Sequence, residues 1–201
     1  MEGGFRVRPV EKLWFSASVY RIDQRNTPVA ETINNDTYYY FEGKSNSRGV
    51  ELSLAGDITE NWTVLAMYAY NRYENRNATG TAPSVFRRTP NHTFSLSTSY
   101  RFDCCDLLRD IVVGCGYRFR SKSFATMRGA FVDNNLYFSH SHVFDVNVYV
   151  PLTKFGGPEN WTLSLGVRNL FGEKYFESAR HFYECLVGEP RTFEIGLRAR
   201  F

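Results

Sequence analysis

Aromatic and cationic side chains that could hold a ligand lie in, or directly after, the segments that connect the regular parts of the sequence. The candidate ligand-binding residues are Tyr38, Tyr39, Tyr40, Arg128, Arg180 and Tyr183. Tyrosine rings can stack on a flat ligand, and an arginine can pair with an anionic one. Plainer interpretations stay open, because the tyrosines could form an aromatic girdle and the arginines could be solvated loop charges.

Motifs for catalysis or metal binding are missing from the sequence. His140 and His142 would share one strand face, but no third ligand lies near them, so we interpret them as structural or solvent-exposed. The four cysteines lack the paired spacing of a zinc site. Neither H-E-x-x-H, G-x-S-x-G nor a phosphate loop occurs. We therefore expect no enzyme, no metal site and no covalently bound cofactor.

Strands must position the candidate residues, because apolar and polar residues alternate along most of the chain. In the last segment, Phe193, Ile195 and Leu197 alternate with Glu194, Gly196 and Arg198. Such alternation puts successive side chains on opposite faces of a strand. The pattern predicts an all-β protein of about nine strands. Their expected ranges are roughly 4–9, 13–29, 37–57, 62–74, 92–102, 110–119, 142–152, 161–171 and 191–201.

The connections between these strands tend to alternate in length. Short ones are expected at 9–12, 58–61, 103–109 and 153–160, and long, polar, irregular ones around 75–91, 120–141 and 172–190. The connection around 30–36 is no longer than some of the short ones. It fits the alternation of short and long connections only if its flanking strands rise above a membrane. Bacterial outer-membrane barrels have short periplasmic turns and long extracellular loops. The pattern therefore favours an antiparallel transmembrane β-barrel over a β-sandwich.

Composition is compatible with a barrel. Charged residues make up 22% of the 201, and the mean hydropathy is -0.38. No stretch approaches the roughly 18 apolar residues of a membrane helix, but barrel strands need apolar residues only at alternate positions. The aromatic content of 16% suits aromatic girdles. A net charge of +3 is too small to suggest nucleic acid as a partner.

Tryptophans and charges give the expected strands an orientation. Trp14, Trp62 and Trp161 each stand near the start of a strand that follows a short turn. We expect them at the periplasmic membrane interface, together with Phe201 at the end of the last strand, since amphipathic rings are favoured there. The charges expected to face a water-lined lumen are Glu51, Asp145, Arg168, Glu194 and Arg198.

Several segments, in order, carry a resemblance to a known family. They are Val19 to Gln24, Ser47-Arg48-Gly49-Val50-Glu51-Leu52, Gly56-Asp57 with Asn61-Trp62, Pro90-Asn91-His92, Asn169-Leu170-Phe171 with Lys174-Tyr175, and Gly188-Glu189-Pro190-Arg191 before the terminal Phe201. Together they resemble the C-terminal barrel portion of TonB-dependent outer-membrane receptors, particularly the ferric-siderophore branch. The resemblance spans nearly the whole chain.

The resemblance implies a receptor of the bacterial outer membrane that binds and imports a ferric siderophore, its transported ligand. It implies three partners: outer-membrane lipid, the TonB energy-coupling complex through an absent N-terminal region, and the barrel assembly machinery through the C-terminal strand. Family barrels have about 22 strands and a plug. We therefore expect residues 1–201 to be the C-terminal part of such a barrel, without the plug and the N-terminal strands.

Two other functions stay open at this point. A passive porin-like outer-membrane barrel would also have a charged, water-lined lumen, and a plug region encoded upstream would favour the receptor instead. A soluble sugar-binding β-protein could use the abundant aromatic residues as stacking platforms. Solubility without detergent would favour that third interpretation.

Overall fold

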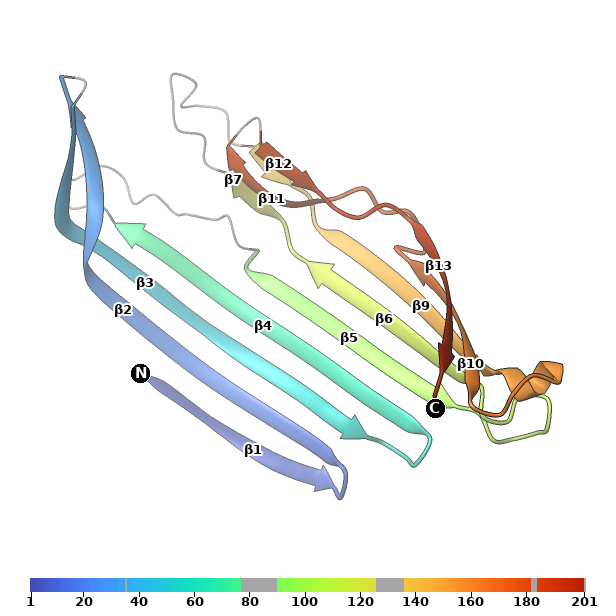
Figure 1. Ribbon diagram of the computed structural model, residues 1–201. Helices are drawn as coiled ribbons and strands as arrows, with labels where there is room; N and C mark the ends of the chain where they lie inside the picture. Colours follow the sequence, from blue (N-terminus) through green and yellow to red (C-terminus); the bar gives the residue numbers. More distant parts are fainter. Residues whose placement is uncertain (35, 77–89, 126–135, 182–183, 201) are drawn as a thin grey trace.

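One antiparallel sheet of nine strands makes up most of the molecule (Figure 1). The computed structural model describes residues 1–201 except 35, 77–89, 126–135, 182–183 and 201. It describes the backbone alone for 27–33, 37, 40, 42–43, 75–76, 124–125, 136, 178–181 and 184. The sheet strands, in spatial order, are β1 (Glu2–Val10), β2 (Leu13–Ile33), β3 (Asp36–Asp57), β4 (Trp62–Arg76), β5 (His92–Arg101), β6 (Val112–Arg120), β9 (Ser141–Pro151), β10 (Trp161–Arg168) and β13 (Thr192–Ala199).

The nine strands confirm the all-β prediction, with bounds close to those expected from alternation. The two longest, β2 and β3, run for 21 and 22 residues. A strand crosses a membrane in about 9–11 residues, so this hairpin projects well beyond the rest of the sheet. Its tip turns at Asn34, whose φ is 52°. The short connection around 30–36 is therefore explained by flanking strands that continue past the apolar part of the sheet.

Two small ribbons interrupt the long connections. They pair β7 (Ser123–Ala125) with β8 (Leu136–Phe138), and β11 (Phe176–His181) with β12 (Glu184–Val187). The sequence predicted irregular structure here, and for these residues that was wrong, because strands of three to six residues carry too little alternation to be recognised. The connection between β9 and β10, at the opposite end of the sheet, contains the 3-10 helix η1 (Leu152–Phe155).

No helix in the described part of the chain is long and apolar enough to cross a membrane.

The register gives the sheet two faces of opposite character. One row of directly paired residues crosses seven strands and is largely apolar: Val7, Phe15, Leu54, Ala66, Leu96, Tyr117 and Phe144. We call this the outer face. The neighbouring row on the inner face is mostly polar: Arg6, Ser16, Ser53, Met67, Ser95, Arg118 and Val143. All five charges that were expected to point inward lie on the inner face.

Many large apolar side chains of the outer face are exposed to solvent in the isolated sheet. On β13, Phe193, Ile195 and Leu197 are 74%, 83% and 56% exposed. Soluble monomers rarely expose continuous apolar patches of this kind. A face covered by lipid explains it, and a soluble sugar-binding protein does not.

Candidate functional site

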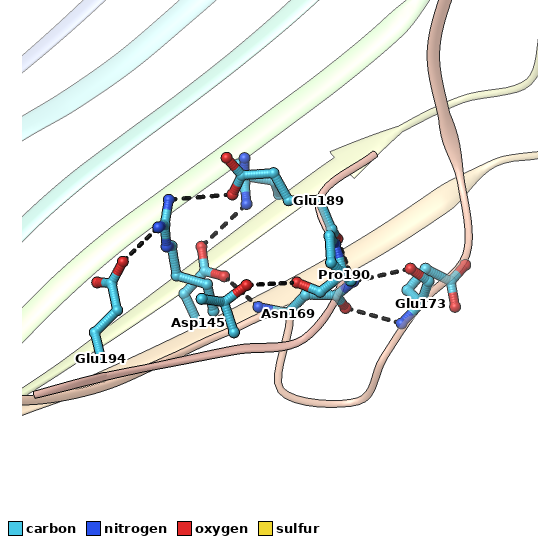
Figure 2. A network of polar contacts seen from close by, with 9 residues as sticks. Asp145, Asn169, Glu173, Glu189, Pro190 and Glu194 are labelled. Atoms are coloured by element: carbon cyan, nitrogen blue, oxygen red, sulfur yellow. Dashed lines mark hydrogen bonds and ion pairs between the residues drawn. The ribbon is translucent and has the colours of Figure 1, made fainter. Parts of the chain in front are cut away.

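A network of polar contacts on the inner face centres on Asn169, directly after β10 (Figure 2). Asn169 has a φ of 50° and is 1% exposed. Its side-chain amide donates to the backbone oxygens of Glu173 at 2.8 Å and Glu189 at 2.9 Å. Its Oδ1 accepts from the backbone nitrogen of Glu173 at 2.8 Å. One side chain thus holds two segments that are far apart in sequence.

Charged groups extend this network across four strands. Arg118 of β6 contacts Asp145 of β9 at 3.2 Å, and Asp145 also accepts the backbone N–H of Asn169 at 2.8 Å. Arg168 of β10 contacts Glu189 at 3.1 Å and also bonds Glu194 of β13. Exposed pairs of this kind contribute only about 0–1 kcal/mol each. They hold charged side chains in place on the inner face.

The Gly188 backbone packs against Tyr175, and this contact joins the two segments that flank the β11–β12 ribbon. Gly188 donates its N–H to the Tyr175 backbone oxygen at 2.8 Å. A Cβ at Gly188 would lie 2.2 Å from the Tyr175 ring, so only glycine fits there. Tyr175 is 8% exposed, and burial raises the pKa of its phenol. Arg120 then donates to the Glu177 backbone oxygen at 2.9 Å, which ties the start of β11 to the sheet.

A hollow of about 530 Å³ lies mainly on the inner face beside this network. Small residues on β5 and β6 leave the space, among them Ser97, Gly114 and Gly116. Arg118 and Asp145 line it as well. The hollow therefore offers hydrogen-bond donors and acceptors on the inner face.

The predicted ligand-binding tyrosines lie on the projecting β2–β3 hairpin. Tyr38 and Tyr39 are 47% and 68% exposed, and the Tyr40 backbone pairs with Val29. Two register shifts separate them from the lower part of the hairpin, so simple alternation does not decide which face they occupy. Figure 1 shows this tip at the same end of the sheet as the β11–β12 ribbon. We call it the long-connection end.

The other predicted ligand residues are only partly described. The Arg180 backbone lies in β11, at the long-connection end, whereas Arg128 and Tyr183 lie outside the described residues. Among the side chains that the structure describes, no hydrogen bond or ring contact joins one candidate to another. Their role in binding stays a prediction.

The tryptophans do not share one face. Trp62 and Trp161 lie on the outer face at the short-turn end. Trp14 lies on the inner face, where the guanidinium of Arg6 is 4.5 Å from its ring centre. Trp14 also lies at the short-turn end, and Leu13, one position earlier, takes the outward position. A role of the three tryptophans at the membrane interface stays a prediction. Phe201 lies outside the described residues.

Sequence reasoning singled out Asp145, Arg168 and Glu194 but missed their partner Arg118. The signal was present, since Arg118 alternates with the apolar residues of β6. The two histidines sit in an aromatic group: the rings of His140 and His142 are 5.2 Å apart, and His142 bonds the Tyr117 hydroxyl at 2.8 Å. In the described part of the chain, no three His, Cys, Asp or Glu residues gather into a metal site.

The sequence is similar to those of known outer-membrane receptors. The family model described as "TonB dependent receptor-like, beta-barrel" matches residues 1–170. The Catecholate siderophore receptor Fiu of Escherichia coli K12 is 29% identical over 197 residues, which are 95% of this chain and 24% of Fiu. The Ferripyoverdine receptor of Pseudomonas aeruginosa is 23% identical, over 92% of this chain and 23% of that protein. The chain thus spans about a quarter of these curated relatives.

Solved structures match the sheet closely. The closed form of the ferric-catecholate import receptor Fiu covers all of this chain with a TM-score of 0.80 and 28% identity, over 27% of that structure's chain. The P. aeruginosa ferripyoverdine receptor bound to ferripyoverdine covers 98% of this chain and 26% of its own, with a TM-score of 0.82. At 20% identity, the second match supports the fold alone.

Proposed function

Because this chain belongs to the TonB-dependent receptor-like β-barrel family of the bacterial outer membrane, we propose that it forms part of a receptor that binds and imports a ferric siderophore. The main support is the match to a catecholate siderophore receptor over 95% of the chain. The family consists of receptors rather than enzymes. The iron chelate would be cargo, with no covalently bound cofactor.

The receptor would capture its ligand at the long-connection end. There Tyr38 and Tyr39 are exposed on the projecting hairpin, where phenol rings could stack on catecholate rings. Arg128, Arg180 and Tyr183 would add charge and hydrogen bonds, because ferric chelates are often anionic. The polar inner face would then line the path of the ligand through the membrane.

The partners of the whole receptor follow from the same proposal. We propose that residues 1–201 are the C-terminal part of a larger barrel, in line with their share of the relatives' length. Preceding residues would supply the plug and the contact with TonB. The final strand would be recognised by the barrel assembly machinery, and lipid would cover the outer face.

Iron uptake by whole cells tests this function. Cells with and without the gene would be given a ⁵⁵Fe-loaded catecholate siderophore, with and without an uncoupler of the inner membrane. We expect uptake that requires both the gene and the membrane potential. Gene-dependent uptake that resists the uncoupler would favour a passive pore, and uptake that does not require the gene would refute the proposal for catecholates.

A further inference from the structure

Three arginines form one row on the outer face. Arg21, Arg48 and Arg72 are directly paired neighbours on β2, β3 and β4, and all three are exposed. Directly opposite side chains on one face have Cβ atoms about 4.5–5.5 Å apart, and like charges in that position are destabilising. Sheet stability alone therefore does not explain this arginine row, and an anion bound across it would.

Two carboxylates neutralise part of the positive charge of the arginine row. Asp23 pairs with Arg21 and Glu74 with Arg72, each at 2.8 Å. The hydrogen bond from Arg21 holds the pKa of Asp23 below its ordinary value, so Asp23 is ionised at neutral pH. Arg48, in the middle of the row, has no carboxylate within ion-pair distance among the described residues.

Further cations extend the same surface. Arg25 and Lys44 pair with each other on the outer face, farther along the hairpin, and both are exposed. With the arginine row they make five cations against the two carboxylates Asp23 and Glu74, a net charge of +3. A hollow of about 420 Å³ opens among these side chains. The surface thus has both excess positive charge and room for an anion.

The arginine row lies immediately above the apolar band. The next outward positions below it are Val19, Val50 and Tyr70. From Trp62 to Tyr70 the strand has nine residues, and about 9–11 are needed to cross a membrane. The Tyr70 ring also contacts the ring of His92, with centres 4.9 Å apart and planes tilted by 40°, and such aromatic rings form the girdle of a barrel. The row is therefore level with the headgroups of the outer leaflet.

We propose that the arginine row, with Arg25 and Lys44, binds the phosphate groups of an anionic lipid in the outer leaflet. Arginine matches phosphate geometry through paired N–H donors. The apolar side chains directly below the row would contact the acyl chains of the same molecule, which a free phosphate does not have. The site lies on the lipid side of the wall and does not depend on which ligand the receptor transports.

Native mass spectrometry of the intact protein that carries this chain tests the proposal. The probe is bisphosphorylated lipid A, with fully dephosphorylated lipid A and inorganic phosphate as comparisons. The triple variant R21Q/R48Q/R72Q should bind lipid A roughly a hundredfold more weakly, since each arginine near an anionic lipid surface contributes roughly a factor of five. The dephosphorylated lipid should bind wild type and variant alike, and millimolar phosphate should not displace lipid A.

A matched control neutralises three arginines on the inner face. R101Q/R198Q/R200Q should leave lipid A binding unchanged, because Arg101 and Arg198 lie on the inner face and Arg200 lines the same inner hollow as Arg198. If the triple variant does not fold, the single variant R48Q carries the same test at roughly a fivefold loss. Equal binding by the arginine-row variants and wild type would overturn the proposal. So would displacement by inorganic phosphate, or equally tight binding of the dephosphorylated lipid to wild type.

Discussion

Asn169 combines a left-handed backbone with a side chain that satisfies three backbone groups. Asparagine tolerates such a φ better than most residues because its short amide can bond locally. Here the amide reaches the Glu173 and Glu189 backbones instead of water. The same residue therefore holds the turn after β10 and the segment before β13, which explains why an asparagine stands at this point of the sequence.

Replacing Asn169 by alanine should lower the free energy of unfolding by about 3 kcal/mol, since buried backbone groups lose their partners and the φ becomes strained. Urea titration in phospholipid vesicles would measure this loss. Asn169→Gly, which removes the bonds but relieves the backbone, should fall between alanine and wild type. Asn160→Ala, at an exposed turn position, should change stability by less than about 0.5 kcal/mol. These hydrogen bonds of Asn169 to Glu173 and Glu189 are called the Asn169 clamp. A small effect of Asn169→Ala would mean that the Asn169 clamp does not stabilise the fold.

Gly188 makes a second residue-level prediction. A methyl group there would overlap the Tyr175 ring, so Gly188→Ala should cost about 1–3 kcal/mol of stability through overpacking. The double variant with Tyr175→Ala should lose less than the sum of the single losses, because the clash is then absent. Gly3→Ala is the control, since nothing lies within 4 Å of that Cβ position. Strict additivity in the urea midpoints would contradict the packing contact.

At the scale of elements, the β2–β3 hairpin divides into a wall and a projection. In the wall, β2 also pairs with β1, and β3 also pairs with β4. The projecting part of β2 and β3 pairs only within the hairpin. An element with few packed neighbours contributes little to global stability. It is free to vary in sequence and to carry a recognition surface.

Replacing residues 26–43 by a two-residue Asn-Gly turn should therefore separate binding from stability. Arg25 and Lys44 are direct register partners, so a tight hairpin turn can join them. We expect the urea midpoint to stay within error of wild type, while siderophore binding, measured by fluorescence quenching, weakens at least about tenfold, or about 1.4 kcal/mol. A lower midpoint with intact binding would assign the hairpin to the structural wall.

The polar contacts on the inner face link whole strands to one another. Arg118, Asp145 and Arg168 link β6, β9, β10 and the segment before β13, although each pair is too exposed to add much stability. The Asn169 clamp and the Gly188 contact hold the segments that flank the β11–β12 ribbon. The ribbon is therefore carried at a defined place over the long-connection end.

For the whole molecule, sidedness is the main property of the sheet. Leu96 and Ser97 are neighbours on β5, but Leu96 belongs to the outer row and Ser97 faces the lumen. Leu96→Arg should therefore cost about 2–4 kcal/mol of stability in a bilayer, as expected for a charge near the membrane midplane. Ser97→Arg should have a much smaller effect, because its side chain enters water. Equal losses in vesicle unfolding experiments would mean that the two faces were assigned wrongly.

The sequence by itself determined the strands and their two faces. Alternation is a local property, since each residue turns its side chain opposite to the one before, and segments such as Phe193 to Leu197 show it without knowledge of their neighbours. The same signal contained the correct face of Trp14, which alternates with Leu13 and Phe15.

Only the tertiary structure decided which residues meet across strands. Register depends on turn geometry and on pairing between distant segments, so it cannot be read within one strand. The contact between Asn169 and Glu189, the pairing in the β11–β12 ribbon and the row of Arg21, Arg48 and Arg72 all arise in this way. Sequence supplied the side chains of the inner and outer faces, and the register assembled them into a clamp and a charged surface.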